Sequence, residues 1–429
     1  MGRLVTTLTR AVRQRVLARA GAVDLSRLDK VPESLAWPLR RDGTAPSARL
    51  QATRNADPVQ RLVRLFGMEV WLVTGDEECR EVLADSASYS TDIRPYMGRS
   101  GSATDGDIGG LGFTDPPDHT RLRRLLVPEF TMRRLQRLAP LIQQVVDRQL
   151  DELEAAAAHA EDGVVDLVPT VAFPVPFLVI CDLLGLPDER RETFRSLATQ
   201  RFDVTGGGPG TLGAIGGSRE FLLAEVARQR HDPGPGLIGQ LIREHGEEIS
   251  DFELGGLADG VFTGGLETSA SMLALGTAHL LEHRELWHRL RADPSIAPAL
   301  VDELLRLLSV VQVAFPRFAR HDVVVAGRSI PAGSVVLCSL PAANRDPRTG
   351  PGDDLDLDRA GPGHLAFGHG FHRCIGAELA RMELVTTLTT MAQRLPDLAL
   401  AAAPEDLEHR ALSIVFGVES VPVTLHAAG

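Results

Sequence analysis

Cys374 lies in a glycine-rich stretch directly before a segment with helical periodicity. A helix N-terminus carries partial positive charge and free N–H groups, both of which stabilise a thiolate at neutral pH. The neighbouring Gly368, Gly370 and Gly376 let the backbone approach a bulky flat group where a Cβ would collide. A stabilised thiolate beside a planar group suits the axial ligand of a haem iron, where sulfur donates electron density that favours O–O cleavage.

Other roles for a cysteine have to be weighed against this one. A lone cysteine is often a small buried hydrophobic residue, and cysteines also bind zinc. The chain has no C-x-x-C pair and no second cysteine near Cys374, which disfavours a zinc site. The other cysteines, Cys79, Cys181 and Cys338, are scattered, which indicates a reducing, cytoplasmic compartment rather than a disulfide framework.

Residues 367–376 read FGHGFHRCIG. This stretch resembles the haem-binding loop of the cytochrome P-450 superfamily, whose pattern is Phe-Gly-x-Gly-x-[His/Arg]-x-Cys-x-Gly. Every fixed position of the pattern is filled, by Phe367, Gly368, Gly370, His372, Cys374 and Gly376. The resemblance implies a b-type haem with Cys374 as the axial iron ligand and with Phe367 and Gly368 in the loop that binds it.

The resemblance also implies the fold. It implies a mainly α protein with a minor β portion, a single domain shaped like a triangular prism, with the haem between a long central helix and the helix after Cys374. We expect this domain to span residues 37–429, after an N-terminal extension of residues 1–36. The extension has arginines and no acid before Asp24, so it is either a helix on a membrane surface or a solvated segment.

A second reactive group, Gly264-Gly265-Leu266-Glu267-Thr268, follows the capping-box pattern Ser250-Asp-Phe-Glu253. Each glycine inside a helix costs about 1 kcal/mol relative to Ala, which indicates a close approach to the backbone or a local opening of the helix. An acid beside a hydroxyl can relay protons to dioxygen, although a surface Glu and an ordinary helical Thr would look the same. The segment resembles the family's [Ala/Gly]-Gly-x-[Asp/Glu]-Thr motif, which implies that Gly264 lies at the haem and that Glu267 and Thr268 are catalytic, with O2 as co-substrate.

Glu303 and Arg306 lie three residues apart on a segment of helical periodicity. Such a pair is usually a weak surface contact. It resembles the family's structural Glu-x-x-Arg, which is buried beneath the cysteine loop and completed by an arginine thirteen residues before the loop's Phe. That count ends on Asp354, a departure that leaves Arg345, Arg348 or Arg359 as the substitute.

Haem carries two propionates that need cations. The resemblance assigns this role to His119 and Arg123, which are four apart and therefore on one helix face, and to Arg317 and His372. Further arginines surround the first two, Arg121, Arg124, Arg133, Arg134 and Arg137. They form either a solvated helix face or a docking surface for an acidic ferredoxin, since the chain has no flavin or iron–sulfur motif. A ferredoxin reductase would supply its electrons from NAD(P)H.

The remaining sequence predicts mostly helices, at 118–127, 130–158, 222–230 and from Cys374 to Pro396. The β-branched runs 323–325 and 334–337 flank Pro331-Ala-Gly333, a hairpin-like pattern. Segments 86–112 and 204–218, rich in Gly, correspond by resemblance to the parts that cap the substrate cavity. The chain has 429 residues and a net charge of −12, which disfavours nucleic-acid binding, and it has no apolar run long enough to span a membrane.

By resemblance, the positions that line the substrate cavity are largely apolar, which suits a lipophilic small molecule: Gly260, Thr263, Val313, Ala314, Ile414 and Val415. We therefore expect a monomeric haem-thiolate monooxygenase that hydroxylates or epoxidises a natural product such as a macrolide, polyketide, terpenoid or peptide. One alternative is an oxidase that couples or closes rings. Another is a non-catalytic helper protein, which the retained Cys374, Glu267 and Thr268 disfavour.

Overall fold

The computed structural model describes residues 33–65, 68–93, 110–202, 210–359, 363–410 and 413–425. Most of the N-terminal extension, and much of the Gly-rich segments 86–112 and 204–218, lie outside these residues. In the part that the structure describes, no helix is both long and apolar enough to cross a membrane.

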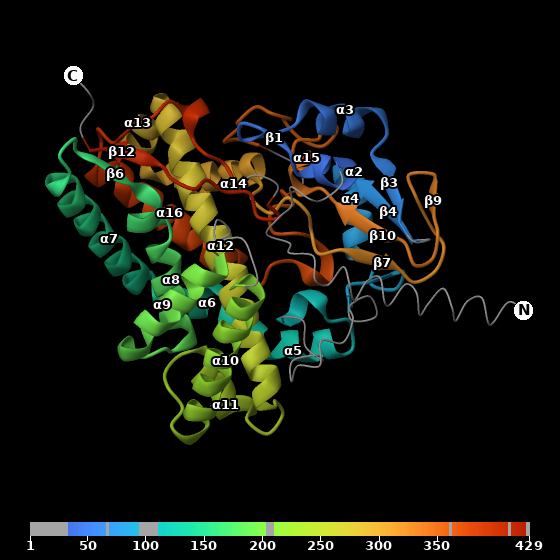
Figure 1. Cartoon of the computed structure of the whole chain (residues 1–429), viewed down its shortest axis with the longest axis horizontal. Coiled ribbons are helices and arrows are strands. Elements are labelled where there is room, and N and C mark those ends of the chain that lie inside the picture. Colours follow the sequence, from blue (N-terminus) through green and yellow to red (C-terminus); the bar gives the residue numbers. More distant parts are fainter. Residues whose placement is uncertain are drawn as a thin grey trace, which may run out of the picture.

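Helices form most of the molecule and gather on one side of it (Figure 1). In chain order they are α2 (Glu33–Ala36), α3 (Ala48–Ala56), α4 (Asp76–Ala84), α5 (Asp118–Leu126), α6 (Met132–Leu135), α7 (Ala139–His159), α8 (Pro174–Leu184), α9 (Asp188–Phe202), α10 (Gly210–His231), α11 (Leu237–His245), α12 (Asp251–Glu282), α13 (Arg284–Ala292), α14 (Ala297–Leu308), α15 (Leu340–Ala343) and α16 (Ala377–Arg394). Short helical turns used below are η3 (Gly110–Phe113), η4 (Val127–Phe130), η5 (Gln136–Leu138) and η8 (Gly370–His372).

The strands are β1 (Arg41–Asp42), β2 (Ala45–Pro46), β3 (Val59–Leu65), β4 (Met68–Val73), β5 (Tyr89–Ser90), β6 (Val164–Asp166), β7 (Arg317–Ala319), β8 (Val323–Val325), β9 (Arg328–Ile330), β10 (Val335–Cys338), β11 (Ala399–Leu400) and β12 (Pro422–Thr424). They lie in two places: most form a smaller region on the other side of α12, and β6 and β12 lie near α13 on the helical side (Figure 1). The largest sheet has the order β3-β4-β10-β7-β5, in which only β4 and β10 are parallel. The expected mainly α fold with a minor β portion is confirmed.

The long central helix α12 begins with the predicted capping box. The Ser250 hydroxyl accepts from the Glu253 N–H, and the Glu253 carboxylate accepts from the Ser250 N–H. These bonds satisfy two donors that a helix start leaves unpaired. Apolar residues of α12, among them Leu266 and Leu273, are buried in one large helical core with α7, α8, α14 and α16. This packing holds the middle of α12 firmly in place.

The predicted helices occur, with differences at their ends. The predicted helix 222–230 is the last part of the longer α10, which begins at Gly210 within the Gly-rich segment 204–218. α5 ends one residue before the predicted end and continues as the turn η4, which contains Pro128. The predicted segment 130–158 is divided into α6, η5 and α7, because the chain tightens into a 3-10 turn before Pro140. The helix after Cys374 is α16, which ends before Pro396 as predicted.

The predicted pairing of residues 323–325 with 334–337 is wrong. β8 pairs with β9, with Val325 opposite Arg328. Ala326 and Gly327 form the turn between them, with φ values of 47° and 76°. Two left-handed residues make the tight turn that joins twisted antiparallel strands. Residues 335–338 form β10 instead, which is parallel to β4 and antiparallel to β7.

Candidate active site

Cys374 lies between η8 and α16, and Gly376 caps the start of that helix. The Cys374 N–H donates to the Phe367 carbonyl at 2.8 Å, which closes the loop on itself. The side chain is exposed, but the surrounding protein still removes enough water to raise the pKa of the thiol above its usual value. A hydrogen bond from the Gly376 N–H and the charges of Arg123 and Arg373 act in the opposite direction. The predicted support from a helix start is therefore present.

The three loop glycines have different tasks. A Cβ on Gly370 would lie 2.6 Å from the Leu83 carbonyl oxygen and 2.8 Å from Ala84 Cα, so this glycine lets the loop pack against α4. Gly368 has φ of 70°, and a Cβ there would meet nothing within 4 Å. A Cβ on Gly376 would lie 4.0 Å from the Cys374 sulfur. Close approach is thus needed at Gly370 for contact with protein, whereas Gly368 supplies a left-handed conformation.

The four predicted propionate ligands, two histidines and two arginines, lie together next to this loop. The His119 and His372 rings lie 4.4 Å apart, between centroids. Burial lowers the pKa of His372 to about 2, and the charges of Arg317, His119 and Arg123 add to this effect. Burial and the charge of Arg123 likewise lower the pKa of His119 to about 4. A bound anion would counteract this effect, because its negative charge favours the protonated form of each basic group.

The hydrogen bonds of this cluster leave donors for such an anion. Two buried nitrogens, His119 Nε2 and Arg317 Nε, have no hydrogen-bond partner among the described residues. Arg317 Nη1 donates to the Phe315 carbonyl at 2.8 Å. Arg123 Nη2 donates to the carbonyl of Arg373, the residue before Cys374, at 2.7 Å. Buried donors without partners are rare and indicate a missing acceptor.

Two further residues support the cluster and were missed in the sequence. Thr91 Oγ1 lies 3.1 Å from His372 Nε2. The Asp115 carboxylate accepts from the Thr91 N–H at 2.9 Å and from Arg320 Nη2 at 2.7 Å. Nothing in the sequence links positions 91, 115 and 372, which meet only because β5 and the segment before α5 lie beside the cysteine loop.

The acid and the hydroxyl of the second motif lie near the middle of α12. Thr268 Oγ1 donates to the Gly264 carbonyl one turn earlier, at 2.8 Å. A Cβ on Gly264 would meet nothing within 4 Å, so the helix surface is open there. α12 is a continuous α-helix through this segment, so the expected local opening of the helix is not present.

Glu267 has a partner that the sequence did not indicate. Arg410 Nη1 donates to Glu267 Oε1 at 3.2 Å. Burial raises the pKa of Glu267 above its usual value, while the charges of Arg410 and Arg201 partly oppose this rise. A carboxyl whose pKa is raised in this way holds its proton more strongly than a solvated one, as a proton donor requires.

The Glu303–Arg306 pair is buried and bidentate, with nitrogen–oxygen distances of 3.0 and 2.8 Å. Arg359 Nε donates to Glu303 Oε1 at 2.8 Å, and the Asp356 N–H donates to Glu303 Oε2. Arg359 therefore takes the role of the second arginine of the family pattern, which the count along the sequence places at position 354. The Asp354 carbonyl accepts from Arg306.

The other two candidates for this position are committed elsewhere. Arg345 donates to the Leu307 carbonyl and to Asp353. Arg348 donates to Asp346 and Glu78.

The predicted substrate residues fall into two groups. Backbone hydrogen bonds bring Val313 and Ala314 beside Ile414 and Val415, because the Gln312 N–H donates to the Ile414 carbonyl and Phe416 N–H to the Val310 carbonyl. Ile414 is 57% exposed, which leaves it open to a ligand.

The second group lies on α12. A Cβ on Gly260 would lie 3.4 Å from Gly110 Cα, so this glycine serves the close approach of η3 to α12. Thr263 Oγ1 donates to the Asp259 carbonyl at 2.8 Å. η3 also touches the first group, since a Cβ on Gly112 would meet the Phe315 ring at 2.5 Å. η3 is therefore shared by both groups.

A thiol at a helix start, basic side chains beside it, and an acid next to a hydroxyl on the central helix are the residue types that a haem-thiolate oxygenase requires. Residues 236–349 match the family model described as Cytochrome P450. Cytochrome P450 165B3 of Amycolatopsis orientalis is 38% identical over 90% of this chain and 97% of its own length. Nocardicin C N-oxygenase of Nocardia uniformis subsp. tsuyamanensis is 37% identical over 86% of this chain and 93% of its own.

Solved structures agree with these relatives. P450 StaH from glycopeptide antibiotic A47934 biosynthesis has a TM-score of 0.79 and 39% identity, covering 90% of this chain and 99% of its own. The chain belongs to the cytochrome P450 family. It is a monooxygenase whose cofactor is haem b and whose reaction uses O2 and electrons drawn from NAD(P)H. The predicted family, fold class and cofactor are confirmed.

The residues present fit this cofactor. The unpaired donors of His119 and Arg317 match the carboxylates that haem carries. Gly264 and Gly368 add no bulk to the two surfaces that would face it. The Gly376 N–H and nearby arginines favour the thiolate form that iron binds.

Proposed function

We propose that this monooxygenase hydroxylates or epoxidises a lipophilic natural product, acting as a monomer with electrons from a ferredoxin. The observation that carries the proposal is the placement of the half-buried Glu267 and Thr268, an acid next to a hydroxyl, on α12 beside the open surface at Gly264. Oxygen insertion needs protons at that place, because O2, two electrons and two protons yield the oxygenated product and water.

Each part of the site has a separate task in this reaction. Bound haem supplies the chemistry that activates oxygen, with Cys374 as the ligand that donates electron density. His119, Arg317 and His372 hold the propionate side of the cofactor, and Arg123 adds positive charge near the sulfur. Glu267 takes up and releases a proton, and Arg410 orients its carboxylate.

Thr268 holds the next position in the relay. Its hydroxyl donates to the Gly264 carbonyl, and its oxygen can accept a hydrogen bond on the open side of the helix. The apolar segments at 313–314 and 414–415 supply the contacts for a lipophilic substrate.

The relatives indicate the kind of substrate. Nocardicin C N-oxygenase and Pentalenic acid synthase act, by their names, on natural products. StaH comes from glycopeptide antibiotic A47934 biosynthesis, and OxyB and OxyE structures come from teicoplanin biosynthesis. These names favour a natural product, with a peptide as the first scaffold to test.

An exposed basic surface next to the cysteine loop supports the ferredoxin as partner. We call this the proximal basic surface, and its exposed members are Arg124, Arg133, Arg137 and Arg373. Arg121 and Arg134, which we also expected there, are already paired with Glu253 and with Glu129 and Glu244. The bond from Arg123 to the Arg373 carbonyl joins α5 to the cysteine loop, so a donor on this surface would lie near the sulfur.

The decisive test is the coupling of electrons to product. With a surrogate ferredoxin and reductase, Thr268→Ala should still consume NAD(P)H but release more hydrogen peroxide and less oxygenated product. Thr277→Val is the matched control, since this α12 hydroxyl is buried and has no hydrogen-bond partner among the described residues. Equal coupling in Thr268→Ala and the parent protein would overturn the proposed relay.

Substrate class and reaction type are tested together. Candidate scaffolds are first screened for the spin-state change of the haem, and turnover products are then analysed by mass. Hydroxylation or epoxidation adds one oxygen atom, whereas the alternative, oxidative coupling or ring formation, removes two hydrogens. A product that has only lost hydrogen would replace the proposed reaction with the alternative.

A further inference from the structure

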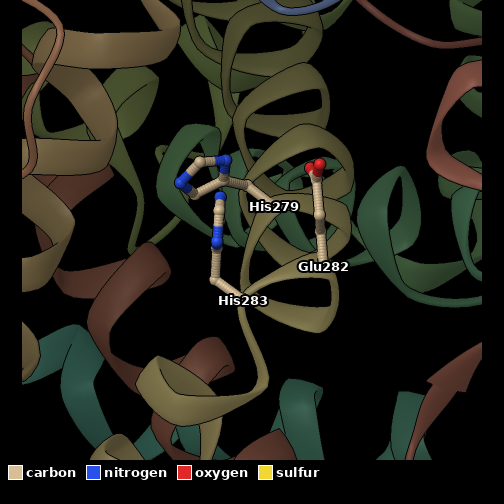
Figure 2. A group of neighbouring side chains, drawn as sticks. All are labelled: His279, Glu282 and His283. Atoms are coloured by element: carbon tan, nitrogen blue, oxygen red, sulfur yellow. The ribbon is translucent and has the colours of Figure 1, made fainter.

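A group of metal-ligating side chains lies at the far end of α12, away from the cysteine loop. His279, Glu282 and His283 each offer one ligand atom, and these atoms lie within 4.8 Å of one another. In the part of the chain that the structure describes, this is the one such group of three. Figure 2 shows the two imidazole rings against each other, with the Glu282 carboxylate reaching the level of the His279 ring.

The helix geometry explains why these side chains meet. Residues three and four apart share one face of a helix, so both Glu282 and His283 lie beside His279. The two rings are 4.4 Å apart between centroids and inclined at 61°. His283 is also the residue where α12 ends and α13 begins, and its N–H donates to the His279 carbonyl at 3.0 Å.

The donor set has a clear chemical preference. Two imidazole nitrogens and one carboxylate oxygen are ligands that Zn²⁺ takes, at distances of about 2.0–2.2 Å. Tetrahedral ligands at those distances lie about 3.3–3.5 Å apart, so the side chains must move by roughly 1 Å to close on an ion. Such movement is open to them, because Glu282 is exposed and both histidines are partly exposed.

The charges around the group also suit a cation. The last turn of a helix carries partial negative charge. Glu285 Oε1 lies 3.8 Å from His283 Nδ1 and can supply a further oxygen. Two cations lie near the group, and both have other partners. The Arg284 guanidinium donates to the Leu398 and Pro396 carbonyls, and Arg345, whose charge also acts on His279, donates to the Leu307 carbonyl and to Asp353.

We propose that His279, Glu282 and His283 form a binding site for a divalent transition-metal ion of the Zn²⁺ class, with water or Glu285 completing its coordination. The site is separate from the haem, because His279 follows Thr268 by eleven residues, about 16 Å along the helix axis. The ion would join the end of α12 to the start of α13 and would stabilise that corner. This inference does not depend on the proposed function.

The test is a calorimetric titration of the chelator-treated, haem-loaded full chain with Zn²⁺. We expect one saturable ion per chain, with at least a tenfold loss of affinity in His279→Gln and in His283→Gln. Glu282→Gln should weaken binding several-fold. His288→Gln, which changes an exposed histidine on α13 outside the group, is the matched control and should bind as the parent does.

Competition and stability give independent readouts. Millimolar Mg²⁺ or Ca²⁺ should not displace Zn²⁺, since these hard cations prefer oxygen ligands. Zn²⁺ should raise the melting temperature of the parent but not of His279→Gln, because only the folded parent holds the site. Zn²⁺ binding that survives in both histidine variants, or the absence of saturable binding in the parent, would overturn the proposal. The red-shifted carbon monoxide band of each variant confirms that it has folded around its haem.

Discussion

Loss of water raises the pKa of the Cys374 thiol above its usual value, and neighbouring groups oppose this rise. The Gly376 N–H bond and the charges of Arg123 and Arg373 act against the rise in pKa that burial causes. Cys374→Ala should therefore abolish the red-shifted Soret band of the reduced carbon monoxide complex, because no thiolate remains to bind iron. The difference spectrum measures this. Cys338→Ala, at a buried cysteine in β10, is the control and should keep the band.

Arg410 sets the charge environment of the proposed proton donor. Its guanidinium opposes the rise that burial causes in the pKa of Glu267. Arg410→Gln removes that opposition, so the pKa of Glu267 should rise further. The midpoint of the pH profile of product formed per NAD(P)H consumed should then move to higher pH.

Glu419→Gln is the control for this shift. The Glu419 carboxylate lies 3.6 Å from Arg410 Nε. Removing its charge leaves the bond between Glu267 and Arg410 in place. The midpoint should stay close to that of the parent protein. An unchanged midpoint in Arg410→Gln would show that this arginine does not tune the acid.

At the scale of the elements, the contact between α12 and α16 contains a buried acid. Burial raises the pKa of Glu383 to about 8, although a hydrogen bond from Ser269 opposes the rise. The unfolded chain has a pKa near 4.5 at this residue, so between pH 4.5 and 8 only the folded state keeps the proton. The free energy of unfolding therefore falls as pH rises through this window, by at most about 1.4 kcal/mol per pH unit.

Glu383→Gln removes this pH dependence. The melting temperature of the variant, relative to the parent, should increase steadily from pH 5 to pH 8. Glu378→Gln changes a partly exposed acid on the same helix and should show no such trend. If the difference in melting temperature between Glu383→Gln and the parent were the same at pH 5 and at pH 8, Glu383 would not titrate in this range.

The segment beneath the cysteine loop depends on the buried Glu303–Arg306–Arg359 network. Arg306→Ala leaves the buried Glu303 carboxylate with only one arginine, and it leaves three carbonyl groups without their donor. The free energy of unfolding should fall by about 3–5 kcal/mol, and haem should be lost. Arg359→Ala should cost less, about 1–3 kcal/mol, because Arg306 still pairs with Glu303. Chemical denaturation with haem content as a second readout measures both.

Two further variants sharpen this prediction. Asp354→Arg should bring no gain in stability, because Arg359 already donates to Glu303. Arg328→Ala breaks a surface pair with Asp57 and should cost less than about 1 kcal/mol. An Arg306→Ala protein as stable as Arg328→Ala would show that burial of the pair is unimportant.

At the scale of the whole molecule, the chain has a net charge of −12, and the proximal basic surface, the proposed docking site of the electron donor, carries the opposite charge. Opposite charges raise the association rate, and salt screens them. The double variant Arg133→Glu, Arg137→Glu should slow haem reduction by an acidic ferredoxin by about tenfold at low ionic strength. The difference from the parent should shrink as salt is added, and stopped-flow absorbance measures it.

A charge reversal elsewhere separates docking from net charge. Arg291→Glu lies on α13, at the other end of the molecule from α5 (Figure 1). It should leave the reduction rate nearly unchanged. Equal slowing by Arg291→Glu and by the double variant would mean that the donor does not dock on the proximal basic surface.

The sequence by itself determined the features that depend on neighbours along the chain. The cysteine loop, the capping box at Ser250 and the helix after Cys374 all arise from short-range patterns of glycine, polar caps and apolar periodicity. For the same reason the family and the mainly α fold could be predicted, since their motifs are local and strict in spacing.

Only the tertiary structure decided which distant groups meet. Arg359 rather than Arg345 or Arg348 completes the Glu303 network, and Arg410 pairs with Glu267 across 143 positions. The β-branched residues of β8 predicted a strand but not its partner, because strand propensity carries no information about pairing. The packing of the whole chain determines which charged and hydrogen-bonding groups meet. The side chains that shift the pKa values in this site come from segments far apart in the sequence, and no local pattern connects these segments.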